Sequence, residues 1–498
     1  MALYDEFAWT KTAYGRWERN IDEAEQFYTT LARRFEGTGR TFFAMTAHVS
    51  FSLSGEVGSL GPITALKNAW LQLRYDHPTI ASWVEYDTKS NRCKKVYESF
   101  REDSITCRQA WLDETFRIIS TSQTGKEWCN SDPPVPKLPT LFLITRENPT
   151  GNYQADVVLR SHHDIIDGIG SLHLLNNLFK YASLFLEKPD SPLPQFGDEW
   201  KTLSPPLRVA ACIPASLDET QQTRIQKLSE TNASIREGIE IAKLPFHKGQ
   251  AVPGCHQRIE LNLDLEQSKK LRHAIKDIGA SVTHVYQAAI ALVLRDLQDR
   301  GPNERKVRYI NYALINERPL CKSPYSTPQH AAAVYHSVSG SSLVIDLVVP
   351  SAEDHTRNDK IKEDEFLEVI EQVKRYYLEI RDDKEHISLA PHYWALSTPA
   401  YPAGPDVPPV PAANDAPSVS ISSMGVVDNI LAPTHGQFEL ESPWVTGEEL
   451  GTGLGLFLST FRGCMCLSAA YNDAWHDKNE VAKFVRECNE LVVRSLGL

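Results

Sequence analysis

The sequence predicts an α/β protein in which mixed β-sheets are layered with helices and the chain is divided into more than one domain. Three observations predict this. Strand and helix patterns follow one another along the whole chain. They recur in a similar order in the two halves. The 498 residues also exceed what a single hydrophobic core usually holds.

The first half is expected to alternate between strands and helices. The strands are rich in β-branched and aromatic residues. The helices are indicated by acidic residues at the start and basic residues at the end, or by a helical period of apolar residues. The expected helices span residues 21–36, 62–76 and 169–187, and the expected strands span 41–53, 80–86, 139–145 and 154–161. Residues 148–152, Asn-Pro-Thr-Gly-Asn, carry a strong turn signal between the last two strands.

A stretch rich in Pro and Ser precedes a second series of strands and helices. It predicts three segments: an N-terminal domain at 1–200, a connection at 201–255 with one helix at 217–229, and a C-terminal domain at 256–498. The expected strands of the last segment are 257–263, 307–315, 333–337, 342–349, 418–423, 453–460 and 463–471. The expected helices are 265–278, 281–299, 362–382 and 477–495, and Pro-rich residues 399–417 are expected to form a long irregular loop.

Composition and charge exclude several classes of function. The formal net charge of −12 argues against a general nucleic-acid binder, which needs a basic face. No secretory signal and no apolar run of transmembrane length is visible, and none of the nine cysteines forms a CxxC pair. We therefore expect a cytoplasmic protein with reduced thiols, no membrane span and no disulfide framework.

The motif His162-His163-Asp164-Ile165-Ile166-Asp167-Gly168 lies between an expected strand and an expected helix. Ligand sites in α/β proteins favour the carboxyl ends of strands. Histidine is suited to general-base chemistry because its ordinary pKa lies nearest neutral pH. Since successive residues of an extended chain point in opposite directions, His162 and His163 cannot both face one cleft. Gly168 would permit a tight exit into the helix, or a close approach of the backbone to a ligand.

The residues alone leave two other interpretations of this motif open. A His-His-Asp cluster can bind zinc or iron, although this needs a third ligand from elsewhere in the chain. The motif can also be a packed structural loop with a hydrogen-bonded histidine.

His162 to Gly168 matches HHxxxDG in full and resembles the signature of the CoA-dependent acyltransferase superfamily, which includes chloramphenicol acetyltransferase and condensation domains of peptide synthetases. Other segments are similar to parts of these proteins: 66–78, 281–299, 312–319 with its Asn-x-Arg, 422–428 and 467–472. The DFGWG motif of the plant branch is absent. The doubled histidine and Ser-Ser-Met-Gly resemble condensation-type and fungal enzymes, and residues 15–19 and 23–28 resemble the fungal trichothecene 15-O-acetyltransferases.

The resemblance implies two chloramphenicol-acetyltransferase-like domains with an active-site tunnel at their interface. His163 would be the general base, and Asp167 would hold the loop, with Arg318 as its ion-pair partner. His162, Gly168 and Asn316 would support the site. Candidates for stabilising the oxyanion, or for lining the tunnel, are Ser422, Ser423 and Gly425, and candidates for the acceptor pocket are Tyr335, His336 and Trp444.

The expected reaction is acyl transfer, with acetyl as the first choice, from acyl-CoA to a hydroxyl of a lipophilic secondary metabolite such as a sesquiterpenoid. The enzyme would be a monomer with acyl-CoA as co-substrate, no tightly bound cofactor and no metal. Three alternatives stay open: a condensation-like transferase that takes its acyl group from a carrier protein, an N-acyltransferase, and a catalytically silent binding homologue.

Overall fold

The computed structural model describes residues 4–54, 60–90, 92–146, 153–354, 359–410 and 418–498. The turn predicted at 148–152 lies outside the described residues, as do residues 411–417 of the predicted loop at 399–417.

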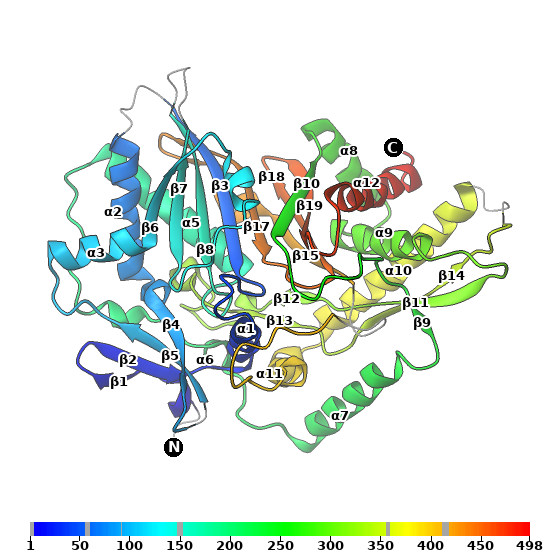
Figure 1. Cartoon of the computed structure of the whole chain (residues 1–498), viewed down its shortest axis with the longest axis horizontal. Coiled ribbons are helices and arrows are strands. Elements are labelled where there is room, and N and C mark those ends of the chain that lie inside the picture. The colour runs from blue at the N-terminus through cyan, green and yellow to red at the C-terminus, as the bar shows by residue number, and fades with distance from the viewer. Residues whose placement is uncertain (1–3, 55–59, 91, 147–152, 355–358, 411–417) are drawn as a thin grey trace.

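A six-stranded sheet forms the centre of the first half of the molecule (Figure 1). Its strand order is β16-β17-β3-β8-β7-β6. The strands are β3 (Met45–Leu53), β6 (Phe116–Ser120), β7 (Thr140–Thr145), β8 (Gln154–Ser161), β16 (Thr434–His435) and β17 (Phe438–Gly447). A smaller sheet of order β1-β2-β5-β4 lies beside it, made of β1 (Thr10–Ala13), β2 (Arg16–Asn20), β4 (Ser82–Asp87) and β5 (Arg92–Glu98).

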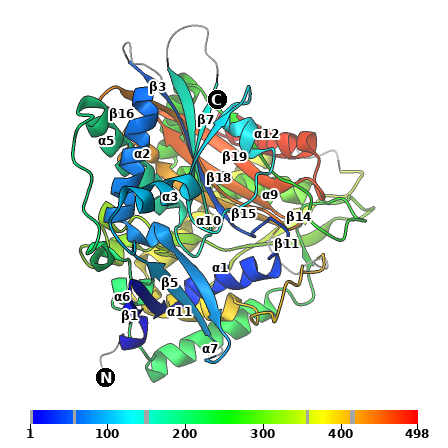
Figure 2. The ribbon, with the colours of Figure 1, turned by 60° about the vertical axis from the view of Figure 1, so that its left-hand side comes forward.

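Two helices cover one face of the six-stranded sheet, α2 (Leu60–Asp76) and α5 (Gly168–Glu187), and they pack against each other (Figures 1 and 2). Leu66, Trp70, Leu172 and Phe179 are fully buried in this core with apolar residues of β3 and β8. The remaining helices of this half are α1 (Glu23–Arg34), α3 (Ile105–Thr115), α4 (Gly125–Cys129) and α6 (Leu207–Ala210). Helix α7 (Glu219–Ser234) follows them in the chain and packs against elements of the second half.

The second half contains a four-stranded sheet of order β10-β19-β18-β15 and a three-stranded sheet of order β14-β11-β9. Their strands are β9 (Glu240–Ile241), β10 (His256–Asn262), β11 (Arg305–Asn311), β14 (Leu343–Val349), β15 (Val419–Val426), β18 (Leu454–Phe461) and β19 (Cys464–Asn472). The helices are α8 (Leu265–Asp277), α9 (Val282–Asp296), α10 (Asp359–Asp382), α11 (His386–Ser397) and α12 (Lys478–Ser495).

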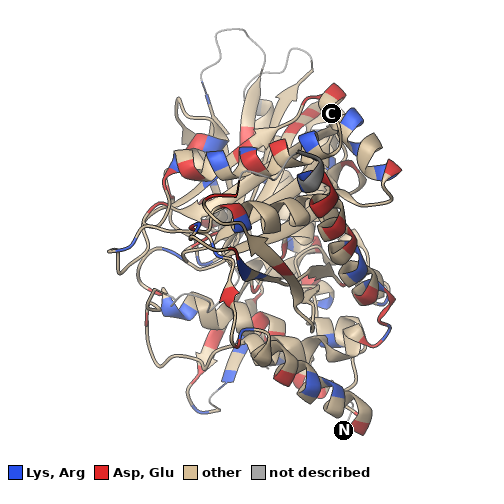
Figure 3. Cartoon of the chain, turned by 90° about the vertical axis from the view of Figure 1, so that its right-hand side faces the viewer, with Lys and Arg blue, Asp and Glu red and all other residues tan. Residues whose placement is uncertain are grey.

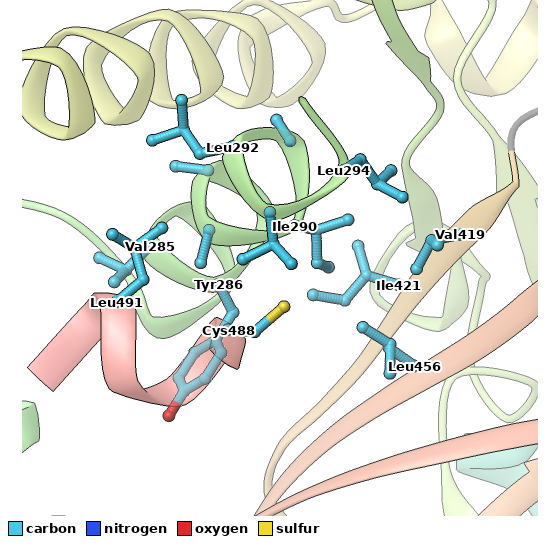
Figure 4. Packing of buried hydrophobic residues seen from close by; sticks show 14 of the residues in the cluster. Val285, Tyr286, Ile290, Leu292, Leu294, Val419, Ile421, Leu456, Cys488 and Leu491 are labelled. Carbon is cyan, nitrogen blue, oxygen red and sulfur yellow. The ribbon is translucent and has the colours of Figure 1, made fainter. Parts of the chain in front are cut away.

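Helix α9 is the centre of the second core (Figure 4). Val285, Ile290 and Leu294 of this helix are buried against β15, β18 and α12. An apolar residue at almost every position explains this placement, because a helix that is apolar on all sides has to be enclosed.

One strand from the late part of the chain belongs to the sheet of the first half. β17 comes late in the chain, yet it pairs with β3 of the first sheet from Phe438↔Leu53 to Gly447↔Met45. The next strand, β18, pairs with β15 and β19 in the second half. The residues between β17 and β18 therefore cross from one sheet to the other.

Most expected elements are present within a few residues of their predicted ends, and two differences have a local cause. The strand expected at 307–315 is two strands, β11 and β12 (Leu314–Asn316), and β12 pairs with β13 (His336–Val338) in a separate two-stranded sheet. β17 was not predicted, because Ser442-Pro443 and a bulge between Glu441 and Trp444 interrupt its alternation.

Figure 3 shows that Lys and Arg positions alternate with Asp and Glu positions along the helices on this side of the molecule. Within the described part of the chain, no single helix is long and apolar enough to cross a membrane; α8 and α9, bent by 91° at their junction, meet that length and composition only as a pair.

Candidate active site

A cavity of about 900 Å³ lies between the two halves. α1, β3 and the loop after β8 line it from the first half, and β12, β13, α11 and β15 line it from the second. Its walls include Phe27, Phe43, Met45, Val338 and Phe457, so they are largely apolar. A space of this size and character suits a small lipophilic molecule together with part of a second substrate.

His163 lines this cavity, whereas His162 is not among the lining residues. The two adjacent histidines therefore point in different directions, as the sequence predicted. The Nδ1 atom of His163 is buried without a hydrogen-bond partner among the described residues, which leaves Nε2 as the nitrogen able to meet a substrate. Burial, and secondly the nearby His336, lower the pKa of His163 to about 3, so its imidazole is neutral at pH 7.

An aromatic stack holds the His163 ring from one side. The ring of Tyr28 lies parallel to it, with the ring centroids 3.8 Å apart and an interplanar angle of 3°. Burial raises the pKa of Tyr28 well above its ordinary value, so its hydroxyl keeps its proton and can donate it to Nε2 of His336, 2.8 Å away. His336 Nδ1 then lies 3.7 Å from Oδ2 of Asp167. Tyr28 and His336 thus connect the His163 ring to the Asp167 carboxylate.

Asp167 and Arg318 form a buried ion pair, as the sequence predicted. Nη1 of Arg318 donates to both carboxylate oxygens of Asp167, at 2.8 and 2.7 Å, and both side chains are at most 5% exposed. The Asp167 carboxylate also accepts the main-chain N–H groups of Gly170 and Tyr335, at 2.7 and 2.8 Å. Burial alone would raise the pKa of Asp167, but Arg318 and His336 outweigh it and hold the pKa well below its usual range.

Asp167 is therefore a structural centre of the loop. It is the N-cap of α5, where an acceptor satisfies a free N–H group of the first helical turn. Through Tyr335 and Arg318 it joins that helix to the second half of the chain. Asp167 lines the cavity, but its four hydrogen bonds occupy the carboxylate, so it is not available there as a free base.

A second buried ionic cluster positions α1, the helix that carries Tyr28. Glu25 accepts two hydrogen bonds from Arg19, at 2.7 and 2.6 Å, and also pairs with Lys95. Lys95 in turn donates to the carbonyl oxygen of Asp164, inside the His162–Gly168 motif. The cluster ties α1 to the His162–Gly168 loop and so fixes Tyr28 relative to His163.

Two glycines follow Asp167 at the start of α5, Gly168 and Gly170. Gly168 does not adopt a positive φ, and a Cβ atom on it would come no closer than 3.4 Å to Met424, so the tight exit expected there does not require a glycine. Gly168 lines the cavity, and the alternative role expected of it, close approach of its backbone to a ligand, stays a prediction. At Gly170 a Cβ atom would collide with the carbonyl oxygen of Ala331 and lie 2.7 Å from Nη2 of Arg318. Gly170 is the residue that lets α5 approach Arg318 closely.

Strand β15 forms one wall of the cavity. Ser422, Ser423 and Gly425 all line it. A bulge between Ser423 and Gly425 breaks the register with β18, and Gly425 has a positive φ of 68°. Asn316 also lines the cavity, and its Oδ1 accepts the main-chain N–H of Arg318 at 3.2 Å.

Of the three predicted pocket residues, only His336 lines the cavity. Tyr335 precedes it in an extended segment, so its side chain points the other way, and its hydroxyl donates to the carbonyl oxygen of Pro205 at 2.9 Å. Trp444 lies on the face of β17 opposite to Val445, where it stacks on His48 at a centroid distance of 5.0 Å. The assignment of Tyr335 and Trp444 to the pocket is corrected accordingly.

Sequence reasoning missed Tyr28 and Gly170 as site residues. Tyr28 belongs to an expected helix 135 positions before His163, and nothing in the helix pattern announces a ring stack. Gly170 offers a weak signal, because a glycine in the first turn of an apolar helix usually has a packing reason. In the described part of the chain, no group of three His, Cys, Asp or Glu side chains is arranged to hold a metal ion.

Comparisons with known proteins find acetyltransferases among the similar sequences. The sequence model of the family described as 15-O-acetyltransferase Tri3 matches residues 142–378, which include His163, Asp167 and Arg318. The acetyltransferase pigO of Monascus ruber is 21% identical over 98% of both chains. The O-acetyltransferase pigM of the same organism is 23% identical over 98% of this chain and 87% of its own. Trichothecene 15-O-acetyltransferase TRI3 of Fusarium sporotrichioides is 23% identical over 85% of this chain and 84% of its own.

Solved structures give the same fold. TRI3 from Fusarium sporotrichioides superposes with a TM-score of 0.78 at 16% identity, covering 98% of each chain. The first condensation domain of the CDA synthetase superposes with a TM-score of 0.61 at 16% identity, covering 95% of this chain and 96% of that one. The relatives named as acetyltransferases support an acyltransferase enzyme, and the superpositions show that the chain has the two-domain, chloramphenicol-acetyltransferase-like fold of TRI3 and the condensation domains.

Proposed function

We propose that the protein transfers an acyl group, acetyl in the first instance, from acyl-CoA to a hydroxyl of a lipophilic secondary metabolite such as a sesquiterpenoid. Relatives named as acetyltransferases support the type of reaction. The apolar walls of the cavity support a lipophilic acceptor, because they offer burial to a hydrocarbon skeleton.

The placement of His163 is the observation that carries the proposal. Its imidazole is neutral, lines the cavity and has one buried nitrogen, so the other can accept a proton from an alcohol. The Tyr28 ring holds it parallel, which limits its rotation before the substrate arrives. A positioned base of this kind typically contributes a factor of about 10² to 10⁴ in rate.

In the proposed reaction, Nε2 of His163 takes the proton of the acceptor hydroxyl while the oxygen attacks the thioester carbonyl carbon. The tetrahedral intermediate collapses with cleavage of the carbon–sulfur bond. The imidazolium returns the proton to the departing thiolate, and the products are an ester and free CoA. No acyl-enzyme forms, and Asp167 holds the loop without exchanging a proton.

Negative charge develops on the carbonyl oxygen of the intermediate, and a hydrogen-bond donor there would stabilise it. Ser422, Ser423 and the main-chain N–H groups around Gly425 are the candidates on β15, and all three residues line the cavity. Removal of one such donor usually lowers kcat by about 10² to 10³.

The proposal is tested by incubating the protein with acetyl-CoA and a panel of terpenoid alcohols and following the release of free thiol. We expect release that depends on the acceptor and falls by about two orders of magnitude or more in His163→Ala. His162→Ala is the matched control and should lose much less, because His162 does not line the cavity. Normal turnover by His163→Ala would refute the assignment of His163 as the base. Activity with a carrier-bound acyl group but not with acetyl-CoA would show that the donor is a carrier protein and not CoA.

A further inference from the structure

Glu449 is a second polar group of the cavity that the proposed reaction does not use. It lies in the crossover between β17 and β18 and lines the cavity. Only 8% of the residue is exposed. Buried carboxyl groups in proteins are normally paired with a cation. An unpaired one in an apolar cavity therefore requires an explanation.

The contacts of Glu449 leave its carboxyl without an ionic partner. Oε1 accepts the main-chain N–H of Gly451 at 2.8 Å, and within the described ranges no Lys, Arg or His side chain pairs with the carboxyl. Its neighbour Glu448, in contrast, pairs with Arg160 at 2.9 Å and does not line the cavity. Burial raises the pKa of Glu449 to about 7, against the main-chain N–H groups of Gly451 and Leu450, which act in the opposite direction.

The sheet places Glu449 on the same side of the cavity as His163. β8 and β17 run in the same direction on either side of β3, since each is antiparallel to it. Met45 of β3 pairs with Ser161 on one side and Gly447 on the other, and His163 and Glu449 each follow two residues later. Two strand spacings separate these chain ends, which amounts to roughly 10 Å.

The surroundings of Glu449 suit the body of an apolar molecule. A Cβ atom on Gly451 would contact Phe42, and one on Gly447 would contact Phe43, at 3.7 and 3.4 Å. Tyr312 lines the same part of the cavity, and the charge of Glu449 contributes, after burial, to raising its pKa to about 12. A carboxyl oxygen beside aromatic rings is a hydrogen-bond acceptor in an otherwise apolar wall.

We propose that Glu449 is a specificity-determining residue that binds a second hydroxyl of the acceptor, at a distance from the hydroxyl that is acylated. This inference rests on the proposed function for the identity of the acylated group. The site would prefer oxygenated lipophilic acceptors over simple alcohols, because a matched buried hydrogen bond discriminates strongly against a ligand that lacks it.

The test uses α,ω-alkanediols of six to twelve carbons and the 1-alkanols of the same lengths as probes. Their dissociation constants are measured by isothermal titration calorimetry on the full chain without an acyl donor. The wild-type protein should bind a diol of suitable length about tenfold more tightly than its 1-alkanol. In Glu449→Leu the preference should disappear or reverse, because a second hydroxyl then only costs desolvation in an apolar wall.

Glu449→Gln provides a second variant that keeps a carbonyl acceptor for Gly451 N–H and replaces the oxygen facing the cavity with an uncharged amide donor. It should reduce the diol preference at least fivefold. Glu441→Gln is the matched control, since it makes the same change at an exposed position of β17 outside the cavity.

Three results would overturn the inference: no diol preference in the wild type, an unchanged preference in both Glu449 variants, or no binding of any diol. If the Glu449 variants bound CoA more weakly but diols unchanged, the carboxyl would belong to the binding site of the acyl donor, which would also overturn the inference. Because binding is measured without transfer, tight diol binding with no acetyl transfer would count against the proposed function alone.

Discussion

At the scale of single residues, the position of His163 depends on groups that do not touch its reacting nitrogen. The Tyr28 ring lies against its face, His336 holds the Tyr28 hydroxyl, and Asp167 lies beside His336. These contacts come from α1, β13 and the loop after β8. The proposed role of His163 as a base therefore depends on the correct placement of three segments around one imidazole.

Replacing Tyr28 separates the ring stack from the hydrogen bond. Tyr28→Phe keeps the ring and loses the bond to His336, which should lower kcat/KM about fivefold. Tyr28→Leu also loses the stack, worth about 0.5–1.5 kcal/mol, and should lower kcat/KM about 50-fold. The measurement is thiol release at pH 7, with the unfolding temperature as a check on folding. Equal losses in the two variants would show that the ring stack has no part in positioning His163.

Removing Arg318 should leave a buried carboxylate without its cation. Arg318→Ala is expected to lower the free energy of unfolding by about 3–5 kcal/mol and to lower activity with it. Urea denaturation followed by circular dichroism measures the first effect.

The matched control is Arg308→Ala, since Arg308 pairs with Asp346 at 2.6 Å on the surface. That change should cost no more than about 1 kcal/mol. Similar losses in the two alanine variants would contradict a special role for the buried pair.

The sequence could predict the local part of the site. His163, Asp167 and Arg318 lie in short motifs, and the structure brings the latter two together. Tyr28 could not be predicted, because its contact with His163 depends on how α1 packs. The assignment of Tyr335 and Trp444 to the cavity was wrong, because the sequence does not show which face of a strand an aromatic residue occupies. Their neighbours His336 and Val445 line the cavity instead.

At the scale of elements, the start of α5 determines how close the two halves approach. Gly170→Ala places a methyl group against Ala331 and Arg318, so it should lower the free energy of unfolding by about 1–3 kcal/mol and disturb the Asp167–Arg318 pair. Gly168→Ala, two residues earlier, meets only ordinary contacts and should be neutral or stabilising, because alanine favours a helix. Thermal unfolding of both variants measures the difference. A Gly170→Ala variant more stable than the wild type would contradict the steric role of Gly170.

Elements were predicted well where periodicity was long and uninterrupted. α5, α9 and α12 have strong apolar faces, β7 is a nearly continuous apolar run, and β8 has an apolar centre at 157–159. β17 was missed because its bulge and proline remove the alternation on which strand prediction depends. Its pairing with β3 also joins segments almost 400 residues apart, which no local pattern reveals.

At the scale of the whole molecule, burial of histidines should make stability depend on pH. Burial lowers the pKa of five buried or half-buried histidines to about 3 to 4, below the ordinary 6.5: His77, His163, His173, His256 and His330. Unfolding exposes them, so the unfolded chain takes up protons below pH 6.5, and the stability present above that pH is lost as the pH falls. Three carboxyl groups act in the opposite direction, because burial raises their pKa to about 7: Asp22, Glu448 and Glu449.

The five histidines outnumber the three carboxyl groups, so unfolding near pH 5.5 should take up a net of about two protons. Each proton is worth about 1.4 kcal/mol per pH unit. We expect the unfolding temperature to fall when the pH is lowered from 7.5 to 5.5 at constant ionic strength, as measured by calorimetry. An unfolding temperature that stays constant or rises over this range would show that the carboxyl groups dominate.

The pairing of the late strand β17 with β3 has a consequence for folding during synthesis. The nine residues of β3 emerge from the ribosome almost 400 residues before their partner, and until then one edge of a largely apolar sheet has open N–H and C=O groups. The first half therefore cannot complete its sheet while it is being synthesised. Chains that end before residue 438 should associate through this edge, and a free peptide covering 434–447 should suppress that association by taking the place of the missing strand.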